Sequence, residues 1–282
     1  MKRKIPKGRG RRARRPLWLM APALLGFGLF YLAPFGVSVY YSLLENMFSR
    51  RFAGLENYAH ILQDEYYLLA LGNTAVFTCV AVPLGVALGF LLAALLQGAQ
   101  GTMARLRGVF LLPMLLPSAA VVLSIGVVFA QDGVIWRLLG YDAMDMRWAL
   151  YVFYIWKNAG LFMMLFMAGF AGIDPQLYEA AALDGCSRFR QHLAITLPLS
   201  IPTVIFVTVL AIVNALKIFK EAYLLYGAYP SREIYMVQHY MNHQFETLHY
   251  QNLTSAAIVF ALGVYVLVAL GMFLAKRLTK ED

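Results

Sequence analysis

The stretch EAAALDGCSRFRQHLAITLP, residues 179–198, lies between two long apolar segments and decides how the chain is organised. Just before it, Asp174 and Pro175 predict a helix start, because aspartate caps free backbone N–H groups and proline is favoured at the first helical position. Gly185 suits the left-handed conformation that ends many helices. We therefore expect a helix over 175–184, about 15 Å long, followed by a glycine turn.

Beyond the turn, Ser187 can cap a second helix, which we expect to end before Leu197 and Pro198. The alanines at 180–182 leave no bulky side chain on much of the first helix, so another surface can approach it closely. Glu179 adds one charge that can pair with a basic residue. These features suit a docking element, but a plain connector lying on the membrane surface explains them equally well.

The composition is that of a membrane protein. Of the 282 residues, 61% are hydrophobic and 14% are charged, whereas a soluble domain has roughly a half and a quarter. The mean hydropathy is +0.63, so we predict an integral membrane protein. Cys79 lies in an apolar run and Cys186 in a polar loop, so we expect neither a disulfide nor a metal site.

Six segments are long and apolar enough to cross a bilayer, for which about 20 residues are needed. They must be helices, because in lipid only hydrogen bonds within the segment satisfy the backbone, and they do not alternate as barrel strands do. The expected spans are about 17–41, 69–96, 108–131, 148–171, 199–222 and 253–275. We therefore predict an all-α membrane protein. Its parts are a basic arm at 1–16, a six-helix domain at 17–275 that includes the loop 174–198, and a tail at 276–282.

The basic residues indicate the orientation. Nine of the 24 Lys and Arg lie in residues 1–16. Such an arm can bind nucleic acid or anionic lipid, but we interpret it as a signal that keeps this end in the cytoplasm, with no nucleic acid as partner. The cytoplasmic segments then hold sixteen Lys and Arg and the outer ones seven, a difference due entirely to the arm. Both termini and the loop 174–198 are expected in the cytoplasm.

Signs of catalysis are few. His239 and His243 are four residues apart, as zinc ligands on a helix are. The sequence HYMNHQ lacks the glutamate that follows the first histidine of a zinc protease motif, so we favour a polar interfacial helix. Neither a nucleophile elbow nor a Walker A loop occurs. We predict no catalytic residue, no metal and no ATP site in this chain.

Polar side chains inside the spans are costly in lipid and mark functional sites. Lys157 and Asn158 interrupt the fourth span, and Asn214, Lys217 and Glu221 lie in the fifth. Lys217 and Glu221 are spaced so that they can pair on one helix face. Two interpretations stay open: the lysine reaches water at the outer end of the span, or the three residues of the fifth span line a polar path through the bundle.

Prolines interrupt two of the spans. Pro83 lies in the second span, and Pro113 and Pro117 break the third. Each removes a backbone hydrogen bond and permits a kink. Kinked helices surround the substrate cavity in many transporters, but structural bending alone also explains these prolines.

A spaced motif runs through the opening stretch. It consists of Glu179, Ala180 and Ala181, then three residues, Gly185, nine residues, Ile195, one residue, and Leu197 and Pro198. At every element this resembles the EAA loop of bacterial ABC importer permeases, and it lies between the fourth and fifth spans on the predicted cytoplasmic side. The six spans and the segment AGLENYAHIL at 53–62 resemble sugar-type permeases similar to the membrane subunits of the maltose transporter. The resemblance covers essentially the whole chain.

The resemblance implies a type I importer in the bacterial cell membrane. Its partners would be a second, homologous permease, two cytoplasmic ATP-binding subunits and an extracytoplasmic solute-binding protein. The 175–184 helix would be the coupling helix, seated in a cleft of the ATPase, with Glu179 paired to a basic residue there. Closure of the ATPase on ATP would open the cavity outward, and hydrolysis would reset it. ATP and Mg would be used by the partners, with no cofactor bound by this chain.

The expected site residues form two sets. Those implied in ATPase coupling are Glu179, Ala180, Ala181, Asp184, Gly185, Ile195, Leu197 and Pro198. Those expected along the substrate path are Asn158, Asn214, Lys217, Phe219, Glu221 and Tyr223, with Phe219 as a stacking surface for a sugar ring.

One departure bears on the cargo. Many sugar permeases carry a Thr-x-Gly-Gly-x-Pro stretch after the fifth span, but here the sequence YLLYGAYPSREIY keeps only Gly227 and Pro230. Carbohydrate is the expected cargo, and glycerol phosphate, a polyamine or an amino acid are the alternatives. A membrane-embedded enzyme using His239, His243 and Lys217 is the hypothesis from another class. An ion channel is not supported, because no selectivity-filter sequence or repeated ring of charges occurs.

Overall fold

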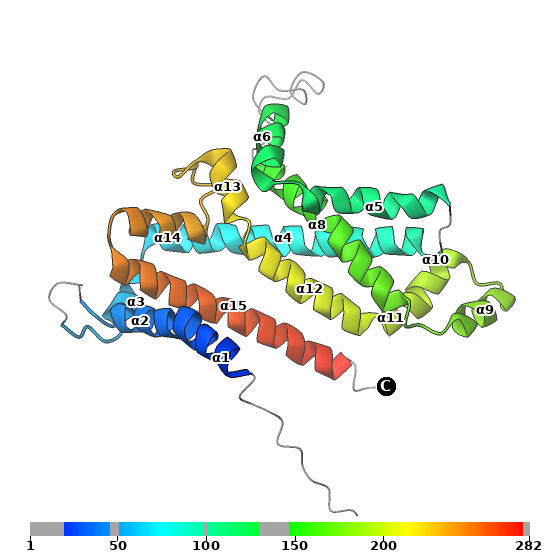
Figure 1. Ribbon diagram of the computed structural model, residues 1–282, viewed down its shortest axis with the longest axis horizontal. Coiled ribbons are helices and arrows are strands. Elements are labelled where there is room, and N and C mark those ends of the chain that lie inside the picture. Colours follow the sequence, from blue (N-terminus) through cyan, green and yellow to red (C-terminus); the bar gives the residue numbers. More distant parts are fainter. Residues whose placement is uncertain (1–19, 46–50, 99–100, 130–146, 279–282) are drawn as a thin grey trace, which may run out of the picture.

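The computed structural model describes residues 20–45, 51–98, 101–129 and 147–278. As predicted, this part of the chain is built of helices, with one isolated backbone bridge between Leu44 and Phe52. Figure 1 shows α4, α12 and α15 running along the long axis of the molecule. The basic arm at 1–16 lies outside the described residues.

The helices have the following bounds. They are α1 (Ala21–Phe27), the π-helix η2 (Gly28–Leu32), α2 (Ala33–Ser42), α3 (Glu56–Ile61), α4 (Glu65–Leu96), α5 (Thr102–Leu115), α6 (Ser118–Phe129), α8 (Arg147–Phe170), α9 (Pro175–Leu183), α10 (Arg188–Gln191), the π-helix η3 (His192–Thr196), α11 (Leu197–Leu199), α12 (Ile201–Leu216), α13 (Phe219–Tyr226), α14 (Val237–Glu246) and α15 (Tyr250–Leu278).

Five helical stretches in the described residues are long and apolar enough to cross a bilayer. They are Ala21–Ser42, Glu65–Leu96, Trp148–Phe170, Ile201–Tyr226 and Tyr250–Phe273. A sixth span is available only as the pair Arg105–Leu115 and Ser118–Val128, whose helices meet at 94°. The segment predicted as one span at 108–131 is therefore sharply bent where it is described. Pro117 lies at the bend, where its missing N–H ends α5, whereas Pro113 is accommodated inside α5.

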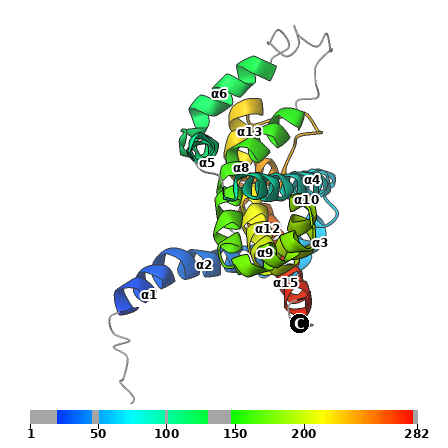
Figure 2. The same cartoon turned by 90° about the vertical axis from the view of Figure 1, so that its right-hand side faces the viewer.

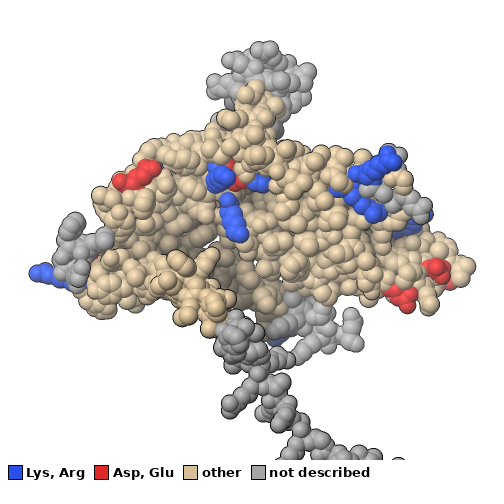
Figure 3. Space-filling model, in the orientation of Figure 1, with Lys and Arg blue, Asp and Glu red and all other residues tan. Residues whose placement is uncertain are grey.

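The surface has the character expected in lipid. On the face shown in Figure 3, Lys, Arg, Asp and Glu gather towards the two ends of the long axis and in one small group between them. Large apolar side chains on α1, α2 and α15 are exposed. Outside this small group, the surface between the two ends is uncharged on this face, which suits contact with the hydrocarbon core, where charged side chains are costly.

Helix α8 is the element around which the bundle packs (Figure 2). It contacts α4, α5, α6 and α12. Phe153, Phe162, Met163 and Phe166 on α8 are almost completely buried. These side chains form the centre of the larger apolar cluster, which α4 completes with Phe77 and its neighbours.

Two glycines let the helices approach α8 closely. A Cβ atom on Gly89 of α4 would lie 2.5 Å from Cβ of Phe162, and one on Gly160 of α8 would lie 1.9 Å from the carbonyl oxygen of Phe110 in α5. In lipid the hydrophobic effect does not drive helices together, so close van der Waals packing at small residues is what associates them. The positions of α4 and α5 on α8 therefore depend on these glycines.

The first span has a different environment. No residue of α1 is buried, and Figure 2 shows α1 pointing away from the bundle. Helix α2 packs against α15. The N-terminal span is therefore attached to the rest of the described chain through its second half.

We predict that Gly160→Ala destabilises the bundle by about 1–3 kcal/mol, because the new methyl group would collide with backbone on a neighbouring helix. The matched control is Gly72→Ala on α4, where an added Cβ meets nothing within 4 Å and the better helix propensity of alanine makes the change neutral or stabilising. Thermal denaturation of the two purified variants checks this. Equal stability of the two would show that the contact between α5 and α8 is not close.

Candidate functional site

Helix α9 begins and ends through the residues that the sequence indicated. Oδ1 of Asp174 accepts a hydrogen bond from the backbone N–H of Gln176 at 3.0 Å, and proline occupies the first turn. Gly185 has φ +77°, and the backbone N–H of Cys186 donates to the carbonyl of Ala181 at 2.9 Å. This closing bond satisfies a carbonyl that the helix end would leave without a partner.

Helix α9 is exposed and projects from the end of the molecule (Figure 1). None of its residues is buried, Glu179 and Ala180 are exposed, and the side chain of Leu183 is 89% exposed. One face is attached to η3, because the Tyr178 hydroxyl lies 2.9 Å from Oγ1 of Thr196. The helix therefore exposes Ala180, Ala182 and the carboxylate of Glu179 on its outer side.

The segment after the turn is longer than predicted. Ser187 caps α10, since its Oγ accepts from the N–H of Arg190. The second helix was expected to end before Leu197 and Pro198, and this expectation is wrong. The π-helix η3 continues directly into α11, which contains Pro198, and the break comes at Ser200.

The remaining residues of the motif lie along this continuation. Ile195 is partly buried, whereas Leu197 and Pro198 are exposed. After the turn at Gly185, the segment 188–199 therefore leads towards α12 as a nearly continuous helix.

A charged pair lies within the bundle. Nζ of Lys157, at the middle of α8, lies 2.5 Å from Oε1 of Glu221 in α13, and the two side chains are 24% and 8% exposed. The same ammonium group donates to Oγ of Ser118 at 2.8 Å. One lysine thus joins α6, α8 and α13, and the carboxylate removes the cost of an isolated charge in lipid.

An amide pair lies next to this ion pair. Nδ2 of Asn214 in α12 donates to Oδ1 of Asn158 at 2.9 Å, and the hydroxyl of Tyr154 donates to the carbonyl of Ala211 at 2.6 Å. Nδ2 of Asn158 donates to the carbonyl of Tyr154 one turn earlier. Polar groups from α8 and α12 therefore meet in the interior of an otherwise apolar bundle.

Three of the six residues expected along the substrate path lie in two separate polar pairs. Asn158 is bonded to Asn214, and Glu221 is paired with Lys157, the neighbour of Asn158 on α8; we call these two pairs the polar cluster. Lys217 is exposed at the end of α12 and does not pair with Glu221, contrary to the spacing argument. The sequence did contain a signal that Glu221 pairs with Lys157, because a lysine at the middle of a span needs an acidic partner.

The two aromatic residues expected along the path lie on α13. The Phe219 and His239 rings pack edge to face with their centroids 5.0 Å apart, and the centroids of Phe219 and Tyr223 are 5.6 Å apart. The Phe219 ring therefore already packs against α14, whereas Tyr223 is 37% exposed.

The paired histidines do not form a common site. His239 is buried, and its Nδ1 accepts from the N–H of Met236 at 3.2 Å. Burial lowers the pKa of His239 to about 4, so this ring stays neutral. His243 instead contacts Tyr229. Among the described residues no three His, Cys, Asp or Glu gather as metal ligands would.

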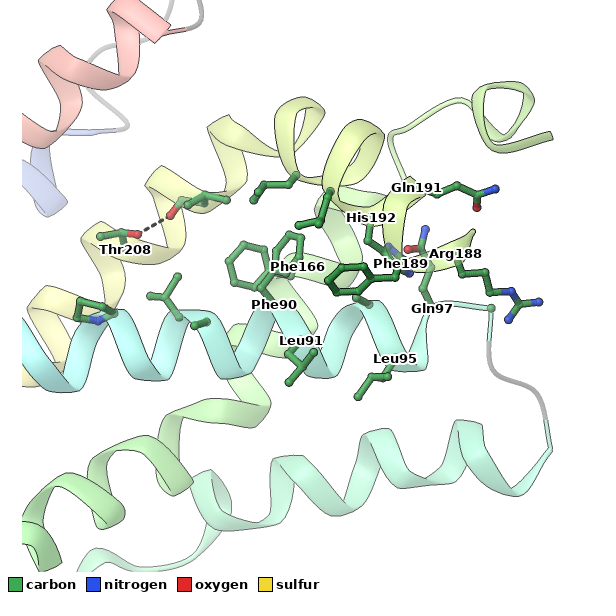
Figure 4. A pocket seen from close by; sticks show the side chains of 18 of the residues that line it. Phe90, Leu91, Leu95, Gln97, Phe166, Arg188, Phe189, Gln191, His192 and Thr208 are labelled. Carbon is green, nitrogen blue, oxygen red and sulfur yellow. Dashed lines mark hydrogen bonds between the residues drawn. The ribbon is translucent and has the colours of Figure 1, made fainter. Parts of the chain in front are cut away.

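A large apolar hollow lies beside the loop 174–198 (Figure 4). Its volume is about 1130 Å³, and it is bounded by α4, the end of α8 and the segment from α10 to α12. Phe90, Phe166 and Phe189 lie along it, and Arg188 and Gln191 lie near one end. The base of α9 is therefore continuous with a cavity that reaches into the bundle.

Comparisons with known proteins agree with this architecture. Residues 73–281 match the family model described as "Binding-protein-dependent transport system inner membrane component". The diacetylchitobiose uptake system permease protein NgcF of Streptomyces coelicolor is 28% identical over 99% of this chain and 89% of its own length. The sn-glycerol-3-phosphate transport system permease protein UgpA of Salmonella choleraesuis is 32% identical, covering 71% of this chain and 72% of its own.

A solved structure has the same fold. It is a bacterial alginate ABC transporter in complex with an alginate pentasaccharide-bound periplasmic protein. The matched chain has a TM-score of 0.80 and 22% identity, and the match covers 94% of this chain and 96% of that one.

We predict that Glu221→Gln lowers the free energy of unfolding by about 2 kcal/mol, between the values for exposed and buried pairs, because Lys157 is partly exposed. The double variant Lys157→Met/Glu221→Leu should recover most of this loss, since no charge stays in lipid without a partner. Thermal denaturation in detergent measures both. A double variant as unstable as the single one would show that the pair is not a unit.

Proposed function

The chain belongs to the family of binding-protein-dependent transport system inner membrane components, and we propose that it is the permease subunit through which an ATP-driven importer moves a carbohydrate. As a member of this family it is a multi-pass membrane protein and a transport subunit rather than an enzyme. The observation that carries the proposal is the exposed, capped helix α9 attached to a bundle with a polar cluster inside it.

Carbohydrate is the cargo that the relatives favour. The relative aligned over nearly the full chain is named for diacetylchitobiose, and the structural neighbour is an alginate transporter. The polar cluster supports a neutral cargo, because its amides are uncharged and the charge of Lys157 is already balanced by Glu221. Glycerol phosphate is the second candidate, since the sn-glycerol-3-phosphate permease is 32% identical.

Helix α9 is proposed to couple this chain to two ATP-binding subunits. Its exposed Glu179 can pair with a basic residue of such a subunit, and Ala180 and Ala181 allow close approach. Asp184 and Gly185 form the turn, and the segment that contains Ile195, Leu197 and Pro198 carries movement into α12. ATP and Mg would be bound by those subunits, and this chain is proposed to hold no cofactor.

The connection between α8 and α9 supports alternating access. Only a short turn, residues 171–174, separates the end of α8 from the start of α9. Movement of α9 would therefore be transmitted to Lys157 and Asn158, which lie on α8 within the polar cluster. Asn158, Asn214, Lys217, Phe219, Glu221 and Tyr223 remain the residues proposed along the substrate path.

The proposed assembly also contains a second, homologous permease and an extracytoplasmic solute-binding protein. The structural neighbour was solved with a periplasmic protein that carries a saccharide, which supports the second of these partners. The basic arm supports an orientation with both termini and α9 in the cytoplasm of a bacterial cell.

The test replaces residues at the coupling surface. We expect Glu179→Lys and Gly185→Asp each to reduce ATP-driven uptake about tenfold or more, since reversing a paired interface charge costs at least about 2 kcal/mol and a side chain at positive φ strains the turn. Uptake by reconstituted complete transporter measures this.

The control is Gln176→Lys, which introduces a lysine at another exposed position of α9 and should leave uptake close to normal. Immunoblotting of membranes verifies that every variant is inserted. If the double variant Glu179→Lys/Gly185→Asp were inserted and transported normally, α9 would not be the coupling helix.

A further inference from the structure

A second hollow is lined by residues near the start of α4 and in α14, elements that Figure 1 shows at the end of the molecule opposite to α9. Its volume is about 370 Å³, and it lies between the junction of α3 and α4, the segment 227–236 and α14. We call it the outer hollow, because the proposed orientation places it outside the cell. Small-molecule sites have volumes of roughly 300–1,000 Å³, so the outer hollow has room for a segment of one or two sugar rings.

Two exposed tyrosines line the outer hollow. The side chain of Tyr66 is 58% exposed and that of Tyr229 is 65% exposed. The Tyr229 ring is held in place by two contacts. Its hydroxyl donates to Oε2 of Glu246 at 3.0 Å, and it packs edge to face with the His243 ring, with the centroids 5.5 Å apart. Flat apolar faces that are already ordered can stack on the C–H face of a sugar at little entropic cost.

A buried polar group opens onto the same space. Gln244 lines the outer hollow and is 7% exposed, yet its Oε1 accepts no hydrogen bond within the described residues. A buried acceptor without a donor is unfavourable by about 1–3 kcal/mol. A ligand hydroxyl would satisfy this oxygen once the amide turns into the hollow, and Arg232, which also lines the hollow, offers N–H donors to hydroxyl oxygens.

The charges around the outer hollow select against anions. The carboxylate of Asp64 lines it, and those of Glu65 and Glu246 bind its lining residues Arg232 and Tyr229. Asp64 is structural, because it caps α4 and accepts from the hydroxyl of Tyr240 at 2.9 Å. An uncompensated negative field repels a phosphate or a carboxylate but not a neutral polyol.

We propose that the outer hollow is a binding subsite for a neutral saccharide, which receives the sugar on the outer side before it enters the bundle. This inference rests on the proposed function and narrows it, because it favours neutral sugars over phosphorylated cargo. Tyr229 would stack on the sugar, Gln244 would accept from a hydroxyl, and Arg232, whose guanidinium lies over the Tyr66 ring at 5.9 Å, would donate to one.

The test measures sugar binding to the complete transporter in nanodiscs, without binding protein or nucleotide. Saturation-transfer NMR with irradiation of aromatic protons reports on maltose, diacetylchitobiose and sn-glycerol-3-phosphate as probes. We expect at least one of the two disaccharides to bind, and Tyr229→Ala and Gln244→Met each to weaken its binding about fivefold. The control Tyr265→Ala removes an equally exposed tyrosine from α15 and should change nothing.

Gln244→Met separates a ligand role from a structural one. Methionine keeps the volume and removes the unpaired acceptor, so thermal stability should stay equal or rise while sugar binding falls. If both hollow variants bound the sugar as tightly as the wild type, the proposal would be wrong, even if their affinity for the binding protein fell. Tighter binding of sn-glycerol-3-phosphate than of either disaccharide would also contradict it.

Uptake by the wild-type transporter distinguishes a failure of the proposed function from a failure of the proposed subsite. If it imports no carbohydrate, the proposed function is wrong and the subsite is wrong with it. If it imports a sugar while the hollow variants bind that sugar normally, only the subsite is wrong.

Discussion

The ammonium group of Lys157 and the carboxylate of Glu221 lie 2.5 Å apart inside a bundle of apolar helices. Either charge alone would be costly in lipid, so α8 and α13 must stay together, and the bond from Lys157 to Ser118 adds the bent third span. On the other faces of α8, Gly160 and the glycines of α4 permit backbone contact. Charge pairing and close packing together fix the positions of the neighbouring helices relative to α8.

Helix α8 links two functional parts of the chain, the polar residues inside the bundle and the exposed helix α9. Within the bundle it carries Lys157 and Asn158, and at its end a turn of a few residues leads into the exposed helix α9. The apolar hollow lies beside the base of α9, and the outer hollow lies at the opposite end of the molecule. An importer needs such an arrangement, since force must enter on one side of the membrane and cargo on the other. The family membership and the geometry therefore support one mechanism.

Local features of the chain could be predicted from the sequence because they depend on neighbouring residues. Asp174 and Gly185 define α9 through backbone hydrogen bonding, and continuous apolar runs allow only helices in lipid. Features that depend on distant residues could not. Glu221 lies 64 positions from Lys157, and Pro117 indicates the break in the third span but not its angle of 94°. The outer hollow joins residues from three separate segments, so no local pattern reveals it.

The central claim is that ATP hydrolysed on the side of α9 moves a neutral sugar through this chain. The most direct measurement is uptake of radiolabelled disaccharides into proteoliposomes that contain the complete transporter, with the binding protein outside and ATP either inside or outside. The account predicts accumulation of sugar with ATP inside, from the transporters whose α9 faces the lumen, no accumulation with ATP outside only, and none of sn-glycerol-3-phosphate. Sugar flux that is independent of ATP, or accumulation of the phosphate and not of sugar, would contradict it.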